Sequence, residues 1–119
     1  GINLSYLRRF HNISSGGIDR GDLNKQKYIF GVSGAAAFYR REALESIKQS
    51  GEYFDEDFFC LVEDVDASWR MQKKGWRVLY CPRAVCTHIG GISRNNSKVR
   101  QFLSMRNRYL MILKNESLL

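Results

Sequence analysis

Residues 54–77 read FDEDFFCLVEDVDASWRMQKKGWR, and this stretch decides the fold of the chain. An aromatic and acidic part comes first. It is followed over residues 63–74 by apolar side chains at helical spacing, with Val65 and Trp69 on one face. Gly75 comes next, and glycine is the residue that most often ends a helix. The stretch therefore predicts a helix over residues 63–74 that opens with several carboxylates.

The residues before this stretch predict strands and a short helix. Residues 28–40 are apolar with small side chains in the middle, and their two flanks, 28–30 and 37–39, have strand character. The small residues indicate a bend or a close approach of the backbone to another group. Residues 41–50 carry apolar side chains at helical spacing and are followed by Gly51, which predicts a short helix.

The residues after the stretch predict two strands and a long helix. Residues 76–81 and 84–88 are apolar runs on either side of Pro82, which breaks a strand. A loop rich in glycine, serine and asparagine follows, and then a helix over residues 97–114. The apolar stripe of that helix comprises Val99, Phe102, Leu103, Tyr109, Leu110 and Leu113, interrupted by Arg106.

The order of these elements predicts an α/β fold with a small mixed sheet flanked by helices. The 119 residues are enough for one domain with one core. Within it we expect an irregular or partly helical N-terminal segment, 1–27, a core portion, 28–96, and a C-terminal helix, 97–119. So few strands leave sheet edges exposed, which predicts marginal stability or self-association.

The net charge of +7 is unevenly distributed along the chain. Residues 1–41 carry seven basic and two acidic side chains, residues 42–66 one basic and nine acidic, and residues 67–119 eleven basic and one acidic. A nucleic-acid-binding domain usually presents basic surface without such an acidic segment. An enzyme that binds a diphosphate and uses a carboxylate as a base needs charges of both signs.

The cysteine content bears on the compartment and on metal binding. An odd number of cysteines, Cys60, Cys81 and Cys86, favours reduced thiols and a cytoplasmic setting. The spacing of Cys81, Cys86 and His88 matches no established zinc pattern, so a zinc site is disfavoured. The sequence also contains no apolar run of the roughly 20 residues that a membrane-spanning helix requires.

The strongest candidate for chemistry is the segment Glu63-Asp64-Val65-Asp66 at the start of the predicted helix. Carboxylates there are favoured by the unpaired N–H groups and by the positive end of the helix dipole. One interpretation is therefore helix capping together with an ion pair between Asp66 and Arg70. The other is a general base, because transfer to a hydroxyl with inversion needs a rigidly held carboxylate that removes the hydroxyl proton.

Three further features have both a structural and a ligand-binding interpretation. The small residues from Gly31 to Ala36 allow either close packing against a helix or close approach of backbone N–H groups to a ligand. His88 ends a predicted strand, where α/β folds place ligands, although a lone histidine is more often structural. The basic residues around the last helix form either a solvated face or a clamp on a diphosphate; they are Arg94, Lys98, Arg100, Arg106 and Arg108.

Taken in order, these segments resemble the second half of family 2 glycosyltransferases, particularly the bacterial rhamnosyltransferase-like branch. The resemblance covers about residues 17–115 and rests on an ordered combination of motifs. These are Ser33-Gly34-Ala35 through Leu44, Phe54-Asp55-Glu56-Asp57-Phe58-Phe59, Glu63-Asp64-Val65-Asp66 with Trp69-Arg70, Gly75-Trp76-Arg77, Pro82-Arg83-Ala84-Val85 with His88, and Arg106-Asn107-Arg108.

The resemblance implies a partial GT-A fold whose N-terminal nucleotide-binding half, with its Asp-x-Asp metal motif, lies outside this chain. It implies that Asp64 is the catalytic base, with Glu63 orienting it, and that His88 helps to hold a divalent metal, Mg²⁺ or Mn²⁺. It places Ser33, Gly34 and Ala35 near the donor sugar and the acceptor. Trp69 and Arg94 are further expected substrate-binding residues. Asp55 and Asp57 are expected to be structural.

The resemblance also implies partners and a location for the parent enzyme. We expect a nucleoside-diphosphate sugar as donor, with rhamnose as one candidate sugar, and a glycan or lipid-linked acceptor. We expect no nucleic-acid partner, a cytoplasmic location that includes the inner face of the cell membrane, and association of the parent with that surface. The 119 residues alone are expected to be inactive.

Two other classes of function stay open on the sequence. A basic nucleic-acid-binding module is disfavoured by the acidic segment at 42–66, and its binding would fall steeply with salt. A non-catalytic carbohydrate-binding or scaffold domain would not need the acidic helix start, so replacing Asp64 distinguishes it from an enzyme.

Overall fold

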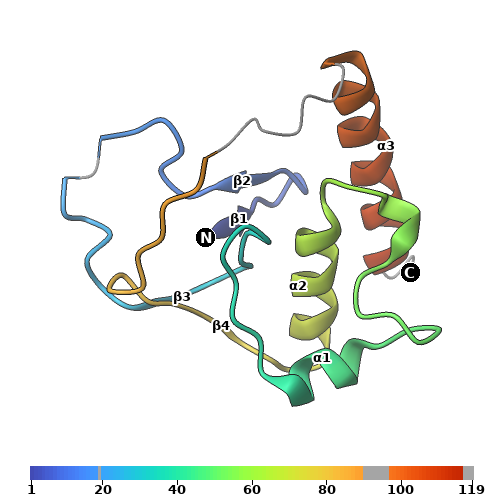
Figure 1. Ribbon diagram of the computed structural model, residues 1–119, viewed down its shortest axis with the longest axis horizontal. Coiled ribbons are helices and arrows are strands. Elements are labelled where there is room, and N and C mark those ends of the chain that lie inside the picture. Colours follow the sequence, from blue (N-terminus) through green and yellow to red (C-terminus); the bar gives the residue numbers. More distant parts are fainter. Residues whose placement is uncertain (19, 90–96, 117–119) are drawn as a thin grey trace.

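The computed structural model describes residues 1–18, 20–89 and 97–116, and Figure 1 shows the course of the chain. In chain order the elements are β1 (Ile2–Leu4), β2 (Phe10–Asn12), β3 (Lys27–Ile29), α1 (Arg41–Ile47), the 3₁₀ turn η1 (Glu56–Phe58), α2 (Glu63–Lys73), β4 (Val78–Tyr80) and α3 (Ser97–Asn115). The predicted α/β class is confirmed, and each of the three predicted helices is present.

Helix α2 lies at the centre of the fold. In Figure 1 it stands between the strands and α3, and α1 lies across its C-terminal end. One apolar cluster joins α2 and α3 to β1, and its buried members include Phe58, Val65 and Met111. A second cluster packs Ala43 and Ile47 of α1 against the other end of α2. Both apolar clusters therefore include residues of α2.

The strands form two antiparallel pairs, β1 with β2 and β3 with β4. The expectation of an irregular or partly helical segment over residues 1–27 is wrong in part, because β1 and β2 form a hairpin there with Leu4 opposite Phe10. A bridge between Ile2 and Gly31 connects the hairpin to the segment after β3. The strands expected at 37–39 and 84–88 do not form, because neither run pairs with another strand in the described part of the chain.

A buried charged group ties the helices together. The Asp66 side chain is fully buried, and its Oδ2 accepts a hydrogen bond of 2.7 Å from Nε of Arg70. The predicted ion pair between these residues is confirmed. Lys114 and Asn115 of α3 also donate to the Asp66 carboxylate, at 3.2 and 2.7 Å. The Arg70 guanidinium donates further to the backbone carbonyl of Ile47, which anchors α1.

The buried face of α3 differs from the predicted apolar stripe. Leu103 is buried as expected, but the other buried positions of the face are Asn107, Met111 and Asn115, none of which belongs to the predicted stripe. The predicted stripe members Phe102, Tyr109 and Leu113 are each more than 60% exposed. The helix is turned so that its asparagine amides reach polar partners, since a buried amide without partners is costly.

Among the described residues, no helix is both long enough and apolar enough to span a bilayer.

Gly31 brings the backbone into close contact with helix α2. Its N–H and carbonyl pair with Ile2, and its other side faces Ser68 of α2. A Cβ atom at position 31 would lie 2.7 Å from Oγ and 2.8 Å from Cβ of Ser68. At Gly34 an added Cβ would come no closer than 3.6 Å to its neighbours, an ordinary contact. Gly31 is thus required for close packing against α2, whereas Gly34 is not.

We predict that Gly31→Ala destabilises the fold by about 1–3 kcal/mol, because the Ser68 side chain cannot move without disturbing α2. Gly34→Ala is the matched control, and its effect is expected to stay within about 1 kcal/mol. Urea unfolding of both variants followed by circular dichroism measures the difference. Equal stability of the two variants would contradict the packing role of Gly31.

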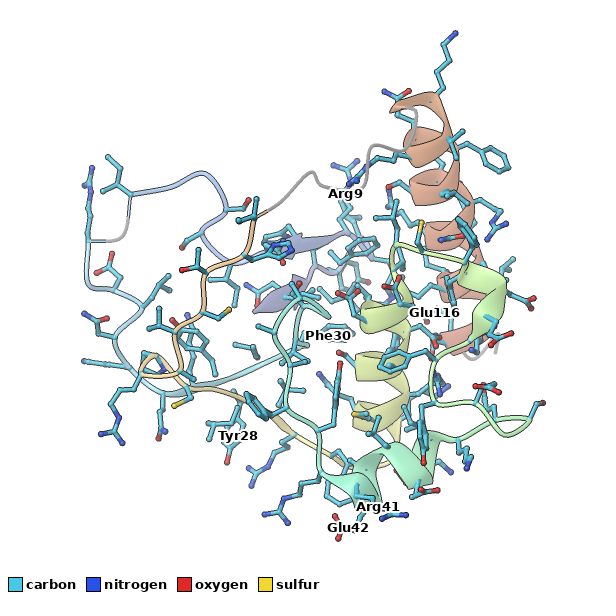
Figure 2. The ribbon with its side chains drawn as sticks, in the orientation of Figure 1. Arg9, Tyr28, Phe30, Arg41, Glu42 and Glu116 are labelled. Carbon is cyan, nitrogen blue, oxygen red and sulfur yellow. The ribbon has the colours of Figure 1, made fainter. Side chains whose placement is uncertain are left out.

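Several large apolar side chains are exposed outside the helices. Tyr6, Ile18, Phe38 and Val85 are each more than 80% exposed. Tyr28 projects outward from β3, as Figure 2 shows, and the Arg77 guanidinium stacks over its ring at 4.3 Å from the centroid. Each two-stranded sheet also has outer edges, which are templates for pairing with another chain.

We therefore predict that the 119-residue chain self-associates as its concentration rises. Sedimentation velocity over a hundredfold range of concentration measures this directly. The weight-average sedimentation coefficient should increase with concentration, because exposed edges and apolar side chains gain partners. A constant monomer value at the highest concentration would contradict the prediction.

Candidate active site

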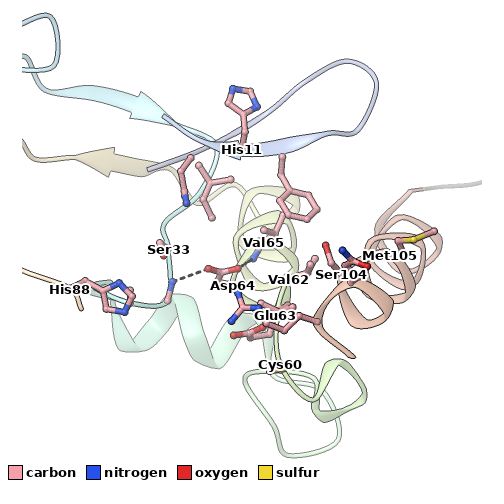
Figure 3. Close-up of a pocket in the computed structure, with 18 residues that line it drawn as sticks. His11, Ser33, Cys60, Val62, Glu63, Asp64, Val65, His88, Ser104 and Met105 are labelled. Carbon is pink, nitrogen blue, oxygen red and sulfur yellow. Dashed lines mark hydrogen bonds between the residues drawn. The ribbon is translucent and has the colours of Figure 1, made fainter. Parts of the chain in front are cut away.

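A cavity of about 980 Å³ lies between the β1–β2 hairpin, the segment after β3, the N-terminal end of α2 and the first turns of α3. Figure 3 shows Asp64 within it, with Ser33 and His88 on one side and Ser104 and Met105 of α3 on the other. Six of the predicted site residues line this cavity: Ser33, Gly34, Ala35, Glu63, Asp64 and His88. The fold thus brings together residues that are up to 55 positions apart in the sequence.

The Asp64 carboxylate is fixed by two backbone N–H groups. Its Oδ2 accepts a hydrogen bond of 2.9 Å from Gly34, drawn in Figure 3, and its Oδ1 accepts one of 2.8 Å from Val65. The bond from the Val65 N–H lies within the first turn of α2. The bond from the Gly34 N–H joins α2 to the segment after β3. Each carboxylate oxygen has two acceptor positions, so both can accept a further hydrogen bond from a molecule in the cavity.

A turn of unusual backbone conformation leads into α2. Phe59, Leu61 and Val62 have φ angles of 60°, 70° and 77°, in the left-handed region that side chains other than glycine rarely adopt. Val62 is the N-cap of α2 and offers no side-chain cap. The Asn107 amide of α3 contacts this turn through the carbonyls of Phe58, Cys60 and Leu61, at 2.8, 2.7 and 2.8 Å.

Two buried oxygen atoms next to the site have no hydrogen-bond partner within the described residues. They are Oε2 of Glu63 and the hydroxyl of Tyr39. Burial, with the negative charges of Asp64 and Glu63, raises the pKa of Tyr39 to about 12, so its phenol stays protonated and can donate a hydrogen bond. A buried carboxylate oxygen without a partner is costly, and such groups are often completed by a ligand or water.

The cavity also contains basic and imidazole groups. Arg100 of α3 lines it, together with His88 and with His11 of β2. His11 was missed in the sequence because the hairpin that carries it was not predicted. Of the predicted basic clamp, Arg106 instead donates to the Asp57 carbonyl and to Oδ1 of Asn107, so it supports the turn before α2. Arg94 lies outside the described residues.

Trp69 does not line this cavity. Its half-buried ring meets the edge of Phe30 at a centroid distance of 6.0 Å and an interplanar angle of 83°. The Arg8 guanidinium lies 5.7 Å from the centre of the Trp69 ring. The position of Trp69 on the apolar face of α2 directs it into the packing between that helix and the hairpin, so its observed contacts are structural.

The described residues do not by themselves fit a complete divalent-metal site. They contain no group of three histidine, cysteine or acidic side chains close enough to hold one ion. The exposed imidazole of His88 could supply one ligand, and the remaining ligands would have to come from elsewhere.

The chemistry that this arrangement allows is proton transfer at the edge of a cavity. A carboxylate held by two N–H groups needs no reorganisation when a hydroxyl approaches it. The neighbouring Glu63 also lines the cavity, and Arg100 can balance negative charge on a bound molecule.

Comparison with known proteins assigns the chain to a family. Residues 9–109 match the family described as Glycosyltransferase like family 2. No curated protein and no solved structure matches the chain. The matched range includes His11, the segment at Ser33, the start of α2 and His88, which are the parts that form the cavity. A nucleotide-sugar donor and an acceptor follow from this match in general terms, and the chain belongs to glycosyltransferase-like family 2.

Proposed function

We propose that this chain forms the acceptor side of an inverting glycosyltransferase in which Asp64 is the catalytic base. The observation that carries the proposal is the Asp64 carboxylate, held by the N–H groups of Gly34 and Val65 at the edge of a cavity of about 980 Å³. The family membership supplies the class of reaction, and the geometry favours this residue over other carboxylates in the described part of the chain.

In the proposed reaction, an acceptor hydroxyl attacks the anomeric carbon of the donor sugar. A new bond forms between that carbon and the acceptor oxygen while the bond to the nucleoside diphosphate breaks. The hydroxyl proton passes to Asp64, and attack opposite the leaving group inverts the configuration. The negative charge leaves on the diphosphate, which Arg100 is positioned to attract on the cavity wall.

Glu63 has a separate role in this proposal. Glu63 lines the same cavity beside Asp64, and its assigned role is to orient the attacking oxygen toward the base. Ser33, Gly34 and Ala35 line the same cavity next to Asp64, and their assigned role is to contact the donor sugar and the acceptor. The N–H of Gly34 has a further function, because it fixes the Asp64 carboxylate.

The remaining parts of the reaction are assigned to a longer protein. We propose that a preceding nucleotide-binding half supplies the base-and-ribose pocket and an Asp-x-Asp motif, and that the 119 residues alone are inactive. Mg²⁺ or Mn²⁺ would neutralise the leaving diphosphate when bound. We propose rhamnose as the transferred sugar and a glycan or a lipid-linked molecule as the acceptor. We also propose that the full-length enzyme acts at the inner face of the cell membrane.

Asp64→Asn in the full-length protein is expected to lower turnover by a factor on the order of 10²–10⁴, because an amide cannot accept the hydroxyl proton. The amide has one acceptor oxygen for the two N–H groups, so the fold should lose about 1–2 kcal/mol. Donor affinity should change little, since the base acts on the other substrate. The measurements are the transferase rate, donor affinity and the melting temperature.

Asp57→Asn is the matched control for this experiment. Asp57 is exposed and lies outside the cavity, and the same chemical change there should leave turnover and melting temperature near those of the unmodified enzyme. Normal turnover of a folded Asp64→Asn enzyme would refute the assignment of the base. Loss of activity in proportion to loss of folded protein would instead favour a purely structural cap.

We further propose that His88 supplies one ligand of the divalent metal in the full-length enzyme. His88→Ala should then raise the Mn²⁺ concentration needed for half-maximal activity several-fold, because one donor is lost. His11→Ala removes the other imidazole of the cavity and should change the metal requirement less. Titration of activity with Mn²⁺, and direct Mn²⁺ binding in the presence of a nucleoside diphosphate, test this. Identical curves for His88→Ala and the unmodified enzyme would exclude it as a ligand.

A further inference from the structure

We infer that Asn107 is a positioning residue for the base: its buried amide holds the strained turn that leads into α2, whose second residue is Asp64. The inference rests on the proposed function, because it assigns Asn107 a role through Asp64. Asn107 lies on α3, 43 residues after Asp64 in the sequence, and does not line the cavity.

The Asn107 amide is fully buried and fully used. Its Nδ2 lies within hydrogen-bond distance of three backbone carbonyls in one short segment, those of Phe58, Cys60 and Leu61. Its Oδ1 accepts a hydrogen bond of 2.9 Å from Nε of Arg106. These bonds give partners to the Cys60 and Leu61 carbonyls, while the Phe58 carbonyl also accepts a hydrogen bond of 2.6 Å from the Cys60 N–H. An amide NH₂ group offers two donors from one nitrogen, which leucine or aspartate at this position cannot provide.

The turn that Asn107 holds is one that the chain does not adopt readily. Within residues 59–62, three residues have positive φ angles, and none of the three is glycine. Val62 is β-branched, which makes the left-handed conformation especially unfavourable. Such conformations persist when the surrounding structure over-determines them, and they gather at functional sites. The three Asn107 contacts, together with the bond from Arg106 to the Asp57 carbonyl, over-determine this turn.

The position of the base follows from the turn. Only Val62 and Glu63 separate Asp64 from the Leu61 carbonyl, and the first helical residue of α2 is Glu63. If the turn relaxes, α2 begins at a different place and the Asp64 carboxylate moves relative to the Gly34 N–H. Displacement of a reacting group by about 1 Å can lower a rate by roughly 10²-fold.

The same helix provides a control for stability alone. Asn115 is also buried, lies on the same face of α3 and donates to Asp66 and to the Met111 carbonyl, at 2.7 and 3.1 Å. It has no bond to the turn at residues 58–62. Replacing either asparagine removes one buried amide from one helix, but only one of them should affect the base.

The experiment compares Asn107→Leu, Asn107→Asp, Asn115→Leu and Asp64→Asn in the full-length enzyme, well below every melting temperature. Both Asn107 variants should lower kcat by a factor on the order of 10–10², with the donor KM changed less than about threefold. The aspartate keeps the shape of asparagine but cannot donate to the carbonyls, so it should not restore turnover. Asn115→Leu should lower the melting temperature and leave kcat within about twofold.

The outcomes separate the inference from the proposed function. If Asp64→Asn is fully active, the base assignment fails and the role of Asn107 fails with it. If Asp64→Asn is inactive but the Asn107 and Asn115 variants share the same kcat, only the positioning role is refuted. Should Asn107→Leu not fold, Asn107→Ser, which retains one hydroxyl donor, is measured instead, and a kcat equal to that of Asn115→Leu would also refute the inference.

Discussion

The fold depends on one buried carboxylate, Asp66. A charge without solvent is tolerated only with close partners, and here Arg70 comes from the same helix while Lys114 and Asn115 come from α3. Arg70 extends the network to the carbonyls of Ile47 and Tyr53, at 2.5 and 2.8 Å, so α1 and the following loop are fixed as well. Loss of one partner of such a group typically costs about 3–5 kcal/mol. The helical half is therefore assembled around a single polar centre, with the apolar clusters on either side of it.

Helix α3 connects this centre to the candidate site. Asn115 reaches Asp66, and Asn107, eight residues earlier, reaches the turn before α2. Eight residues correspond to about 12 Å along a helix, so one amide contacts the turn before α2 and the other contacts Asp66 within α2. The polar bonds fix both the rotation and the register of α3, which apolar contacts alone would leave less sharply defined. This also explains why Phe102, Tyr109 and Leu113 face outward although their spacing predicts a buried stripe.

The sequence predicted those features that arise from neighbouring residues. The three helices, the pairing of Asp66 with Arg70 and the acidic start of α2 follow from spacing, caps and charge, and all are present. The order of the motifs also identified Gly34, Asp64 and His88 as candidate site residues, and the three line one cavity. The hairpin at residues 2–12, the contribution of His11 and the role of Asn107 depend on contacts between distant segments, which local periodicity does not encode. The positive φ angles at Phe59, Leu61 and Val62 were equally hidden, because glycine is the usual signal for them.

The small-residue segment shows how packing and chemistry share one stretch of chain. Gly31 allows the backbone to touch Ser68, whose hydroxyl donates to the Asp64 carbonyl at 2.7 Å and lies 3.4 Å from the N–H of Val32. This contact aligns the segment with the first turn of α2, and the alignment brings the Gly34 N–H to the Asp64 carboxylate. Asp64 is thus constrained from the side of Gly34 and, through the turn before α2, from the side of α3. Because both constraints are made by the protein alone, the carboxylate is oriented before any substrate enters, which is the condition under which a weak base becomes an effective one.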